Sequence, residues 1–261
     1  MNKFIVVPCY HEYENINILL DEIAKCKFDN LIVVIVDDSE NSFEKRVKKQ
    51  TFKTIYLNRK KKGGRGSAVI FGIKYILNLN VDINMIIEMD ADLSHDPKEL
   101  FDNLNYFKEN NLDLLISSRY KKNSKIINWS FNRKILSFCS NKLTNFLLKV
   151  PVSDYTNGYR IYSSKAANFV ANNCGKIGDG YIVLSEILMQ LYFNKFKVDE
   201  VSTIFVNRVK GVSNVTIKEI LISLIGLIKI WKIKKKLKVF LTSNIPNHYA
   251  IDGQRRALVV I

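Results

Sequence analysis

Two apolar runs that each end in a pair of carboxylates constrain the fold of this chain more than any other feature. Residues 31–36 form an unbroken Leu/Ile/Val stretch ahead of Asp37-Asp38, and residues 85–89 lead directly into Asp90-Ala91-Asp92. Such runs are typical of central strands that are buried on both faces of a parallel sheet. Because helix-like segments separate them, the pattern predicts an α/β domain with a mostly parallel, Rossmann-like central sheet flanked by helices.

The polar motifs of the first half all follow expected strands. In an open parallel sheet, ligands bind beyond the carboxyl ends of the strands, so motifs at these ends converge on one edge. Four such motifs are present: Cys9-Tyr10-His11-Glu12, Asp37-Asp38-Ser39, Asp90-Ala91-Asp92 and Ser117-Ser118-Arg119-Tyr120. Together they indicate a ligand site at this edge more strongly than any one motif does alone.

The Asp90-Ala91-Asp92 motif has the chemistry of a divalent metal site. A strand end lets the side chains of Asp90 and Asp92 project to the same side, so both carboxylates can share one ion. Hard oxygen ligands suit Mg²⁺ or Mn²⁺, which also bind phosphate oxygens. The alternative is a surface turn, because Asp, Ser and Pro all favour turns. Convergence with the other strand-end motifs favours the metal site.

The charge balance points to an anionic partner. Lys and Arg number 40 against 25 Asp and Glu, a formal net charge of +15, which favours nucleic acid, an anionic membrane surface or a phosphorylated substrate. We expect no nucleic-acid partner, because the chain has no interleaved aromatic and basic motif and no known recognition module. The four cysteines show no Cys-x-x-Cys pair, so neither a zinc site nor a disulfide framework is expected.

Residues 217–240 join an apolar stretch to a lysine-rich one. The apolar positions give a broad helix face: Ile220, Leu221, Leu224, Ile225, Leu227, Ile228 and Trp231. This pattern predicts an amphipathic helix lying in the headgroup plane of an anionic membrane, and the alternative is a helix packed on the core with a basic end. No segment approaches the roughly 20 apolar residues that cross a bilayer, and we expect no secretory signal ahead of residues 4–8.

Four motifs resemble those of the family 2 glycosyltransferases with the GT-A fold, most closely the dolichol-phosphate mannose synthase and polyprenyl-phosphate glycosyltransferase group. Residues 7–15 are similar to the family's opening motif, and residues 89–97 are nearly identical to its metal motif. Residues 154–160 resemble its Asp-x-x-x-Gly-x-Arg segment, and residues 205–213 resemble its Phe-x-x-Arg-x-x-Gly-x-Ser signature. The resemblance covers residues 4–220 and implies a GT-A fold, to which residues 217–241 add a C-terminal amphipathic interfacial helix.

The resemblance also assigns roles to individual residues. It implies that the nucleotide is contacted by Pro8, Tyr10, Glu12, Val36 and Asp38. It implies that Asp90, Ala91 and Asp92 hold the diphosphate and the metal, with Asp92 the principal ligand. Arg119 and Arg208 would contact the donor phosphates, and Arg133 with Ser137 would meet the acceptor phosphate. The residues on which catalysis is expected to depend are Asp92, Arg119 and Arg133.

Four positions depart from the family's motifs. The usual Thr-Tyr-Asn-Glu is Cys9-Tyr10-His11-Glu12, and the usual Asp-Asp-Gly-Ser is Asp37-Asp38-Ser39-Glu40. The Gly-Leu-Gly ahead of a helix is Gly64-Arg65-Gly66, and the Lys expected after Gly-x-Ser is Asn214. The last departure removes one expected phosphate contact unless Lys210 replaces it.

The expected activity is inverting, metal-dependent transfer of a hexose to a polyprenyl or dolichyl phosphate, with mannose from GDP-mannose favoured. Phosphate oxygens are already anionic at neutral pH, so such an acceptor needs no general base, which suits a chain with three histidines. The alternative uses UDP-glucose or UDP-N-acetylglucosamine and a sugar or protein hydroxyl acceptor. That chemistry requires a general base, for which Glu186 is the candidate.

The resemblance and the charge pattern together divide the chain into three parts. We expect a catalytic domain at residues 1–216, a basic membrane-surface helix at residues 217–241 and a tail of unknown structure at residues 242–261. The expected partners are a nucleotide-sugar donor, a polyprenyl-phosphate acceptor and a membrane surface. The expected location is the cytoplasmic face of a membrane, either as a peripheral protein or with a membrane-spanning partner subunit.

Overall fold

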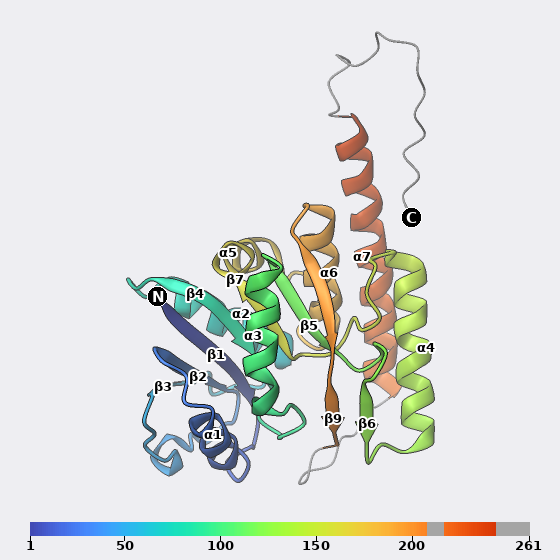
Figure 1. The fold of residues 1–261 in the computed structure, drawn as a ribbon. Coiled ribbons are helices and arrows are strands. Elements are labelled where there is room, and N and C mark those ends of the chain that lie inside the picture. The colour runs from blue at the N-terminus through green and yellow to red at the C-terminus, as the bar shows by residue number, and fades with distance from the viewer. Residues whose placement is uncertain (208–216, 244–261) are drawn as a thin grey trace.

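The strand order of the main sheet brings distant segments of the chain to one edge. The computed structural model describes residues 1–207 and 217–243, and for residues 217–221 and 238–243 only the backbone. In this part of the chain, seven strands form one sheet in the order β3-β2-β1-β4-β7-β5-β8 (Figure 1). The strands are β1 (Asn2–Cys9), β2 (Leu31–Asp37), β3 (Lys53–Asn58), β4 (Ile83–Glu88), β5 (Leu114–Ser118), β7 (Arg160–Ser163) and β8 (Val198–Ser202). The expected α/β, GT-A-like architecture is confirmed.

The register places the strand ends level with one another. Cys9 at the end of β1 pairs with Asp37, and Asp37 pairs with Asn58 at the end of β3. The strand β7 is antiparallel to its neighbours, so its first residue, Arg160, lies opposite Glu88, the last residue of β4. Residues 154–159, which precede β7, therefore open at the same edge as the carboxyl ends of the parallel strands. The sequence pattern did not indicate this reversed strand.

Helices cover both faces of the sheet. The helices are α1 (Ile16–Lys25), α2 (Arg65–Leu77), α3 (Leu100–Glu109), α4 (Phe131–Leu148), α5 (Ser164–Asn173), α6 (Ile182–Phe193) and α7 (Ile217–Ser243), with short 3-10 turns η1 (Glu44–Arg46) and η2 (Pro97–Glu99). On one face, Val34 and Val36 pack with α2, α5, α6 and α7. On the other, Val33 and Ile35 pack with α1 and α3. The unbroken apolar run at residues 31–36 is thus buried on both sides, as expected of a central parallel strand.

The chain leaves the main sheet after β8 and turns at Thr203. The Thr203 hydroxyl donates to Glu99 Oε2 at 2.6 Å, and the Ile204 N–H donates to Glu99 Oε1 at 2.8 Å. These bonds turn the chain away from β8 into β9 (Ile204–Val206), which pairs in parallel with β6 (Lys125–Ile127). The two-stranded β6–β9 sheet is drawn next to the lower half of α4 in Figure 1.

The expected C-terminal helix forms α7, and one of its faces packs against the domain. Leu227 and Ile230 are buried in the core cluster shared with α6, whereas Ile222, Ile225 and Ile228 are about half exposed. One face of the helix therefore packs on the core, and contact of the exposed face with a membrane stays a prediction. Within the described residues, no helix has the length and apolar character that a bilayer-spanning segment needs.

Candidate active site

The two aspartates of the metal motif lie just beyond the end of β4. Asp92 is 9% exposed, and its Oδ1 accepts the Ser94 N–H at 3.1 Å. Asp90 is more accessible, with 18% of its side chain exposed, and its Oδ1 accepts the Arg65 Nε–H at 2.7 Å. Both carboxylates are therefore held by local donors at the carboxyl edge of the sheet. This is the placement that the strand-end pattern predicts.

His95 holds the backbone of this motif. Its Nδ1 accepts the Asp90 N–H at 3.1 Å, so its proton lies on Nε2, which is 3.1 Å from Asn157 Oδ1. Burial lowers the pKa of the His95 imidazole, and the neighbouring carboxylates of Asp90 and Asp92 oppose this only in part. The ring is 1% exposed and stacks on Tyr159 at 5.1 Å. His95 is thus a neutral residue that holds the backbone of the motif in place.

The donor set at this edge fits a Mg²⁺ or Mn²⁺ ion that is shared with a diphosphate. Such ions are commonly bound by one or two carboxylates, with phosphate and water oxygens completing the shell. Within the described residues, no three or more His, Cys, Asp or Glu side chains come together as a metal cage. Asp90 and Asp92 would therefore be the protein ligands, and the remaining ligands would come from substrate and solvent.

The end of β2 is tied to the start of α2 through Asp38. The guanidinium of Arg59 donates to both carboxylate oxygens of Asp38, at 2.6 and 2.7 Å, and the Gly63 N–H donates to Oδ2 at 2.8 Å. Arg59 Nη1 also donates to the Ser67 hydroxyl at 2.7 Å. A bidentate ion pair of this kind fixes both position and orientation. The predicted contact of Asp38 with a nucleotide is untested.

The remaining predicted nucleotide residues lie along the ends of β1 and β2. Tyr10 is partly exposed, with its hydroxyl 3.4 Å from Glu40 Oε1 and Lys62 Nζ 4.6 Å from its ring centre. Glu12 Oε2 accepts the Asn15 side-chain N–H at 2.6 Å. Pro8 is partly buried and Val36 is fully buried. The structure brings these residues to the same edge as Asp38.

Arg119 is enclosed within the fold. Its Nε donates to Asp154 Oδ2 at 2.7 Å, and its Nη2 donates to Asp154 Oδ1 at 2.8 Å and to the Thr156 hydroxyl at 2.8 Å. The guanidinium also lies over the rings of Trp129 and Phe205, at 5.5 and 5.4 Å. Arg119 therefore organises the loop that precedes β7. Its predicted contact with donor phosphates stays a prediction.

Arg133 and Ser137 lie one turn apart on α4, on the side of the helix that faces Tyr120 and Trp129. Arg133 lies 4.1 Å from the Trp129 ring centre and donates through Nη1 to Asn207 Oδ1 at 3.0 Å. The Tyr120 hydroxyl donates to Ser137 Oγ at 2.6 Å. The two predicted acceptor residues are thus brought together, beside the loop that carries Arg119.

Arg208 and Glu186 differ from the other candidates, because Arg208 lies outside the described residues and Glu186 is buried. Arg208, predicted to contact phosphate, lies outside the described residues, as do Lys210 and Asn214. Glu186 is 1% exposed, and its Oε2 accepts the Gly175 N–H at 3.0 Å. Burial raises the pKa of the Glu186 carboxyl, and the backbone N–H groups of residues 175–177 oppose this shift. Its carboxylate supports a loop, which leaves the hydroxyl-acceptor alternative without its candidate base.

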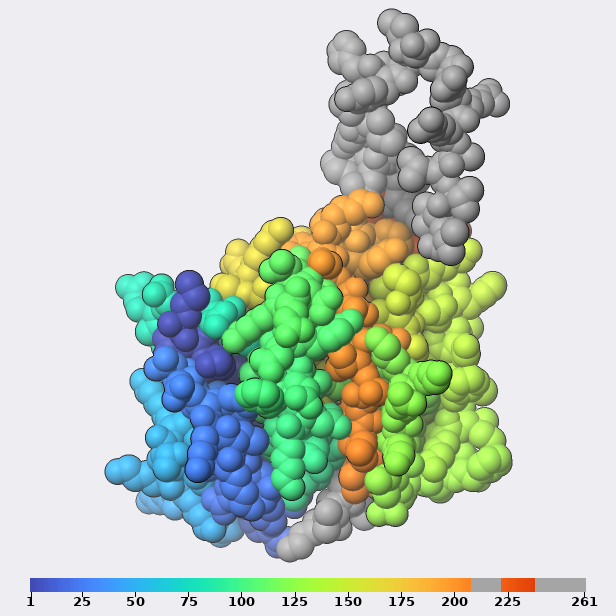
Figure 2. Space-filling view, viewed as in Figure 1, coloured from blue at the N-terminus to red at the C-terminus, as the bar shows by residue number. Residues whose placement is uncertain are grey.

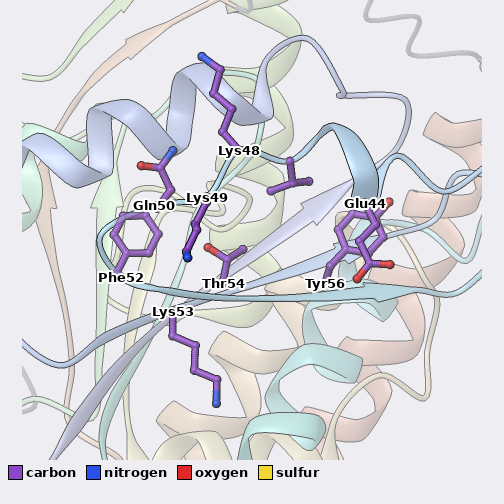
Figure 3. Close-up of a pocket in the computed structure, with 9 residues that line it drawn as sticks. Glu44, Lys48, Lys49, Gln50, Phe52, Lys53, Thr54 and Tyr56 are labelled. Atoms are coloured by element: carbon purple, nitrogen blue, oxygen red, sulfur yellow. The ribbon is translucent and has the colours of Figure 1, made fainter.

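A surface pocket lies beside the donor edge, on the outer strand of the sheet (Figure 3). It is lined by residues of η1, the following loop and β3: Glu44, Val47, Lys48, Lys49, Gln50, Phe52, Lys53, Thr54 and Tyr56. None of these is a predicted site residue. The pocket is connected to the donor edge through Tyr56, whose hydroxyl donates to Asp37 Oδ2 at 2.5 Å.

Sequence reasoning missed two charged residues of this edge, Arg59 and Glu88. It also missed the role of a third, Arg65. Arg65 was noticed only as a departure from a Gly-Leu-Gly motif. The structure places it between Glu88 and Asp90, with both of which it forms ion pairs. The sequence signal for this role was the arginine itself, which stands where the family motif has leucine. Glu88, inside an apolar strand, was a second signal of the same kind.

Comparisons with known proteins identify the family of this chain. A sequence model described as "Glycosyl transferase family 2" matches residues 4–170. A polyprenol monophosphomannose synthase of Mycolicibacterium smegmatis is 28% identical over 216 residues, which cover 81% of this chain and 80% of that protein. An undecaprenyl-phosphate mannosyltransferase of Micrococcus luteus is 28% identical over 165 residues, covering 62% of this chain and 66% of that protein.

Solved structures show the same fold. A glucosyl-3-phosphoglycerate synthase from Mycobacterium tuberculosis, in complex with UDP, superposes with a TM-score of 0.61 at 14% identity, covering 88% of this chain and 80% of that one. The same enzyme in complex with Mn²⁺, UDP-glucose and phosphoglyceric acid gives a TM-score of 0.62. The family model covers residues 4–170, which include β1 to β7 and the Asp90-Ala91-Asp92 motif, and the chain therefore belongs to glycosyl transferase family 2.

Proposed function

We propose that this glycosyltransferase moves mannose from GDP-mannose to a polyprenyl phosphate, with inversion at the anomeric carbon and with Mg²⁺ or Mn²⁺ as cofactor. The observation that carries the proposal is the similarity to a polyprenol monophosphomannose synthase over 216 residues. That length is enough to include the donor-side aspartates and the α4 residues Arg133 and Ser137.

The residues of the site would act in two ways: some hold the substrates in position, and others provide positive charge. A divalent ion held by Asp90 and Asp92 would supply positive charge to the departing diphosphate. The ion pair of Asp38 with Arg59 fixes the end of β2, where the nucleotide is expected. Arg133 offers a fixed guanidinium fork to an acceptor phosphate. Since a phosphate oxygen is already a nucleophile at neutral pH, holding it in line with the anomeric carbon is the main task of the protein.

The surface beside Arg133 suits a lipid-borne acceptor. The outer side of α4 exposes apolar side chains that recur along one face, Phe131, Ile135, Phe138 and Phe146, of which Phe131 and Phe146 are 75% and 73% exposed. The neighbouring α7 exposes Ile222, Leu224, Ile225 and Ile228. We refer to these eight residues as the α4–α7 surface, and α4 forms one flank of the molecule in Figure 2.

The charge around the α4–α7 surface favours an anionic bilayer as its occupant. Helix α4 carries Arg133, Lys134 and Lys142 and no acidic residue, and residues 222–237 of α7 carry no acidic residue and five lysines, of which all but the buried Lys234 are exposed. Apolar side chains that enter the headgroup region, flanked by lysines that reach anionic lipid, give reversible peripheral binding. We infer that the protein binds the cytoplasmic membrane face through this surface and takes its lipid acceptor there, with or without a membrane-spanning partner subunit.

The proposal is tested by sugar transfer to a short polyprenyl phosphate. Radiolabelled GDP-mannose, UDP-glucose and UDP-N-acetylglucosamine are compared with Mg²⁺ or Mn²⁺, and Asp92→Ala serves as the inactive control. Lipid-soluble label from GDP-mannose alone, lost in Asp92→Ala, is the expected result. Label from another donor would replace the sugar assignment. Metal-dependent nucleotide binding without lipid-soluble label from any donor would overturn the lipid-phosphate acceptor.

A further inference from the structure

The guanidinium of Arg65 lies between a fully buried carboxylate and the carboxylate of Asp90. Its Nε and Nη2 are 2.7 and 2.6 Å from Asp90 Oδ1, and its Nη1 forms an ion pair with Glu88 Oε1. The side chain of Arg65 is 12% exposed and that of Glu88 is 0% exposed. One arginine thus connects the interior of the sheet to the proposed metal site.

The surroundings hold Arg65 in this position. It is the first residue of α2, so its backbone is fixed by the helix. The Tyr162 hydroxyl donates to Glu88 Oε2 at 2.7 Å, which orients the carboxylate that faces Arg65. A Cβ atom on Gly158 would come within 1.7 Å of Arg65 Nη2, so glycine at that position makes room for the guanidinium. These contacts hold the Arg65 guanidinium in one position.

A fixed cation next to Asp90 opposes the binding of a second cation there. An ammonium or guanidinium and a metal ion that share one carboxylate repel each other, and the repulsion is strong in a partly buried site where water screens poorly. A nucleotide diphosphate changes this balance, because its negative charges attract both cations. The metal ion and the nucleotide should then bind cooperatively, and each should raise the affinity for the other by the same factor.

We propose that Arg65 acts as an internal counter-cation of the donor site, which competes with the divalent metal for Asp90 and makes tight metal binding depend on the nucleotide diphosphate. This inference rests on the proposed function only in taking Asp90 and Asp92 as the metal carboxylates. It does not depend on which sugar is transferred or on the acceptor. Arg65 is a positioning residue in this scheme, because it acts on the metal through Asp90.

The test measures Mn²⁺ affinity directly, by electron paramagnetic resonance of free Mn²⁺, in the full chain with and without GDP or UDP. The Arg65→Gln variant removes the positive charge and keeps hydrogen-bond donors toward Glu88 and Asp90. We expect it to bind Mn²⁺ at least about tenfold more tightly than wild type when no nucleotide is present. We also expect the gain in Mn²⁺ affinity on adding nucleotide to be smaller than in wild type by a similar factor.

Two further variants keep the test decisive. If Arg65→Gln does not fold, the double variant Arg65→Leu/Glu88→Leu replaces both buried charges at once, which is far less disruptive than removing one, and tighter Mn²⁺ binding is again expected. Lys61→Leu is the matched control, because it removes one positive charge from the exposed loop ahead of α2, and its Mn²⁺ affinity should stay within twofold of wild type.

The outcomes separate this inference from the proposed function. Unchanged or weaker Mn²⁺ binding in the folded Arg65 variants would overturn the inference, and so would an equal gain in Lys61→Leu. If the Arg65 variants behave as expected while no sugar reaches polyprenyl phosphate, the inference stands and the acceptor assignment fails.

Discussion

Arg119 and Asp154 form a bidentate ion pair inside the protein, with Nε–Oδ2 and Nη2–Oδ1 distances of 2.7 and 2.8 Å. The Arg119 N–H also donates to Asp154 Oδ2, at 3.0 Å. The pair joins the end of β5 to the loop before β7, which are 35 residues apart in the chain. Burial by itself would raise the pKa of the Asp154 carboxyl, but the charge and hydrogen bonds of Arg119 outweigh this and hold the pKa below its usual range.

We predict that Asp154→Asn destabilises the protein by about 3–5 kcal/mol at pH 7, because it leaves the buried Arg119 charge unpaired. The pKa of Asp154 is lower in the folded than in the unfolded protein, where it is about 3.9. The stabilisation is therefore complete above about pH 4 and is lost as the pH falls through the folded-state pKa. Urea unfolding of both proteins from pH 7 to pH 3 should show the difference shrinking at the acid end. A difference independent of pH would refute this account.

We predict that Asp92→Asn lowers the rate of sugar transfer by about 100-fold or more, because it weakens the metal that stabilises the leaving diphosphate. Initial rates at saturating donor and several Mn²⁺ concentrations measure the effect. Asp102→Asn removes a carboxylate from the exposed side of α3 and should leave the rate within twofold of wild type. Equal losses in the two variants would show that general charge, and not this carboxylate, sets the rate.

We predict that Arg133→Ala raises the KM for polyprenyl phosphate by about tenfold, since a charge-assisted hydrogen bond contributes about 1.5–3 kcal/mol. The affinity for the nucleotide should change little, because Arg133 lies on α4 beside Trp129 and Asn207, whereas the aspartates expected to bind the donor lie at the ends of β2 and β4. Lys134→Ala, one residue away and exposed, is the control of equal charge. A weaker nucleotide affinity with an unchanged acceptor KM would move Arg133 to the donor site.

We predict that Phe146→Asp lowers binding to anionic lipid vesicles by about tenfold or more, because burying a Phe side chain contributes about 1.5–3 kcal/mol. Vesicle co-sedimentation at two salt concentrations separates the apolar from the electrostatic contribution to vesicle binding. Phe101→Asp is the matched control: Phe101 is 64% exposed, but it lies on α3 and outside the α4–α7 surface. Equal losses for both variants would contradict membrane docking through that surface.

The sequence by itself determined the parallel part of the sheet and the position of the donor edge. The apolar run at residues 31–36 and the aspartates after β4 suffice for this, because burial on both faces and strand-end placement are local properties of the chain. The resemblance added residue roles; the structure places Asp38 and Asp90 at the carboxyl edge of the sheet, and Arg133 and Ser137 on α4. Their actions on substrate are still predictions.

Only the tertiary structure decided which charges meet. The antiparallel strand β7 brings Gly158 and Tyr162 beside Arg65 and Glu88, and nothing in the local pattern of residues 160–163 indicates its direction. The same holds for Asp154, which reaches Arg119 only because β5 and β7 are neighbours. Local sequence sets the conformation of each segment, whereas ion pairs between distant segments depend on strand order, which is settled by packing of the whole domain. Arg65 was a departure from a motif in the sequence, and the fold makes it the partner of Asp90.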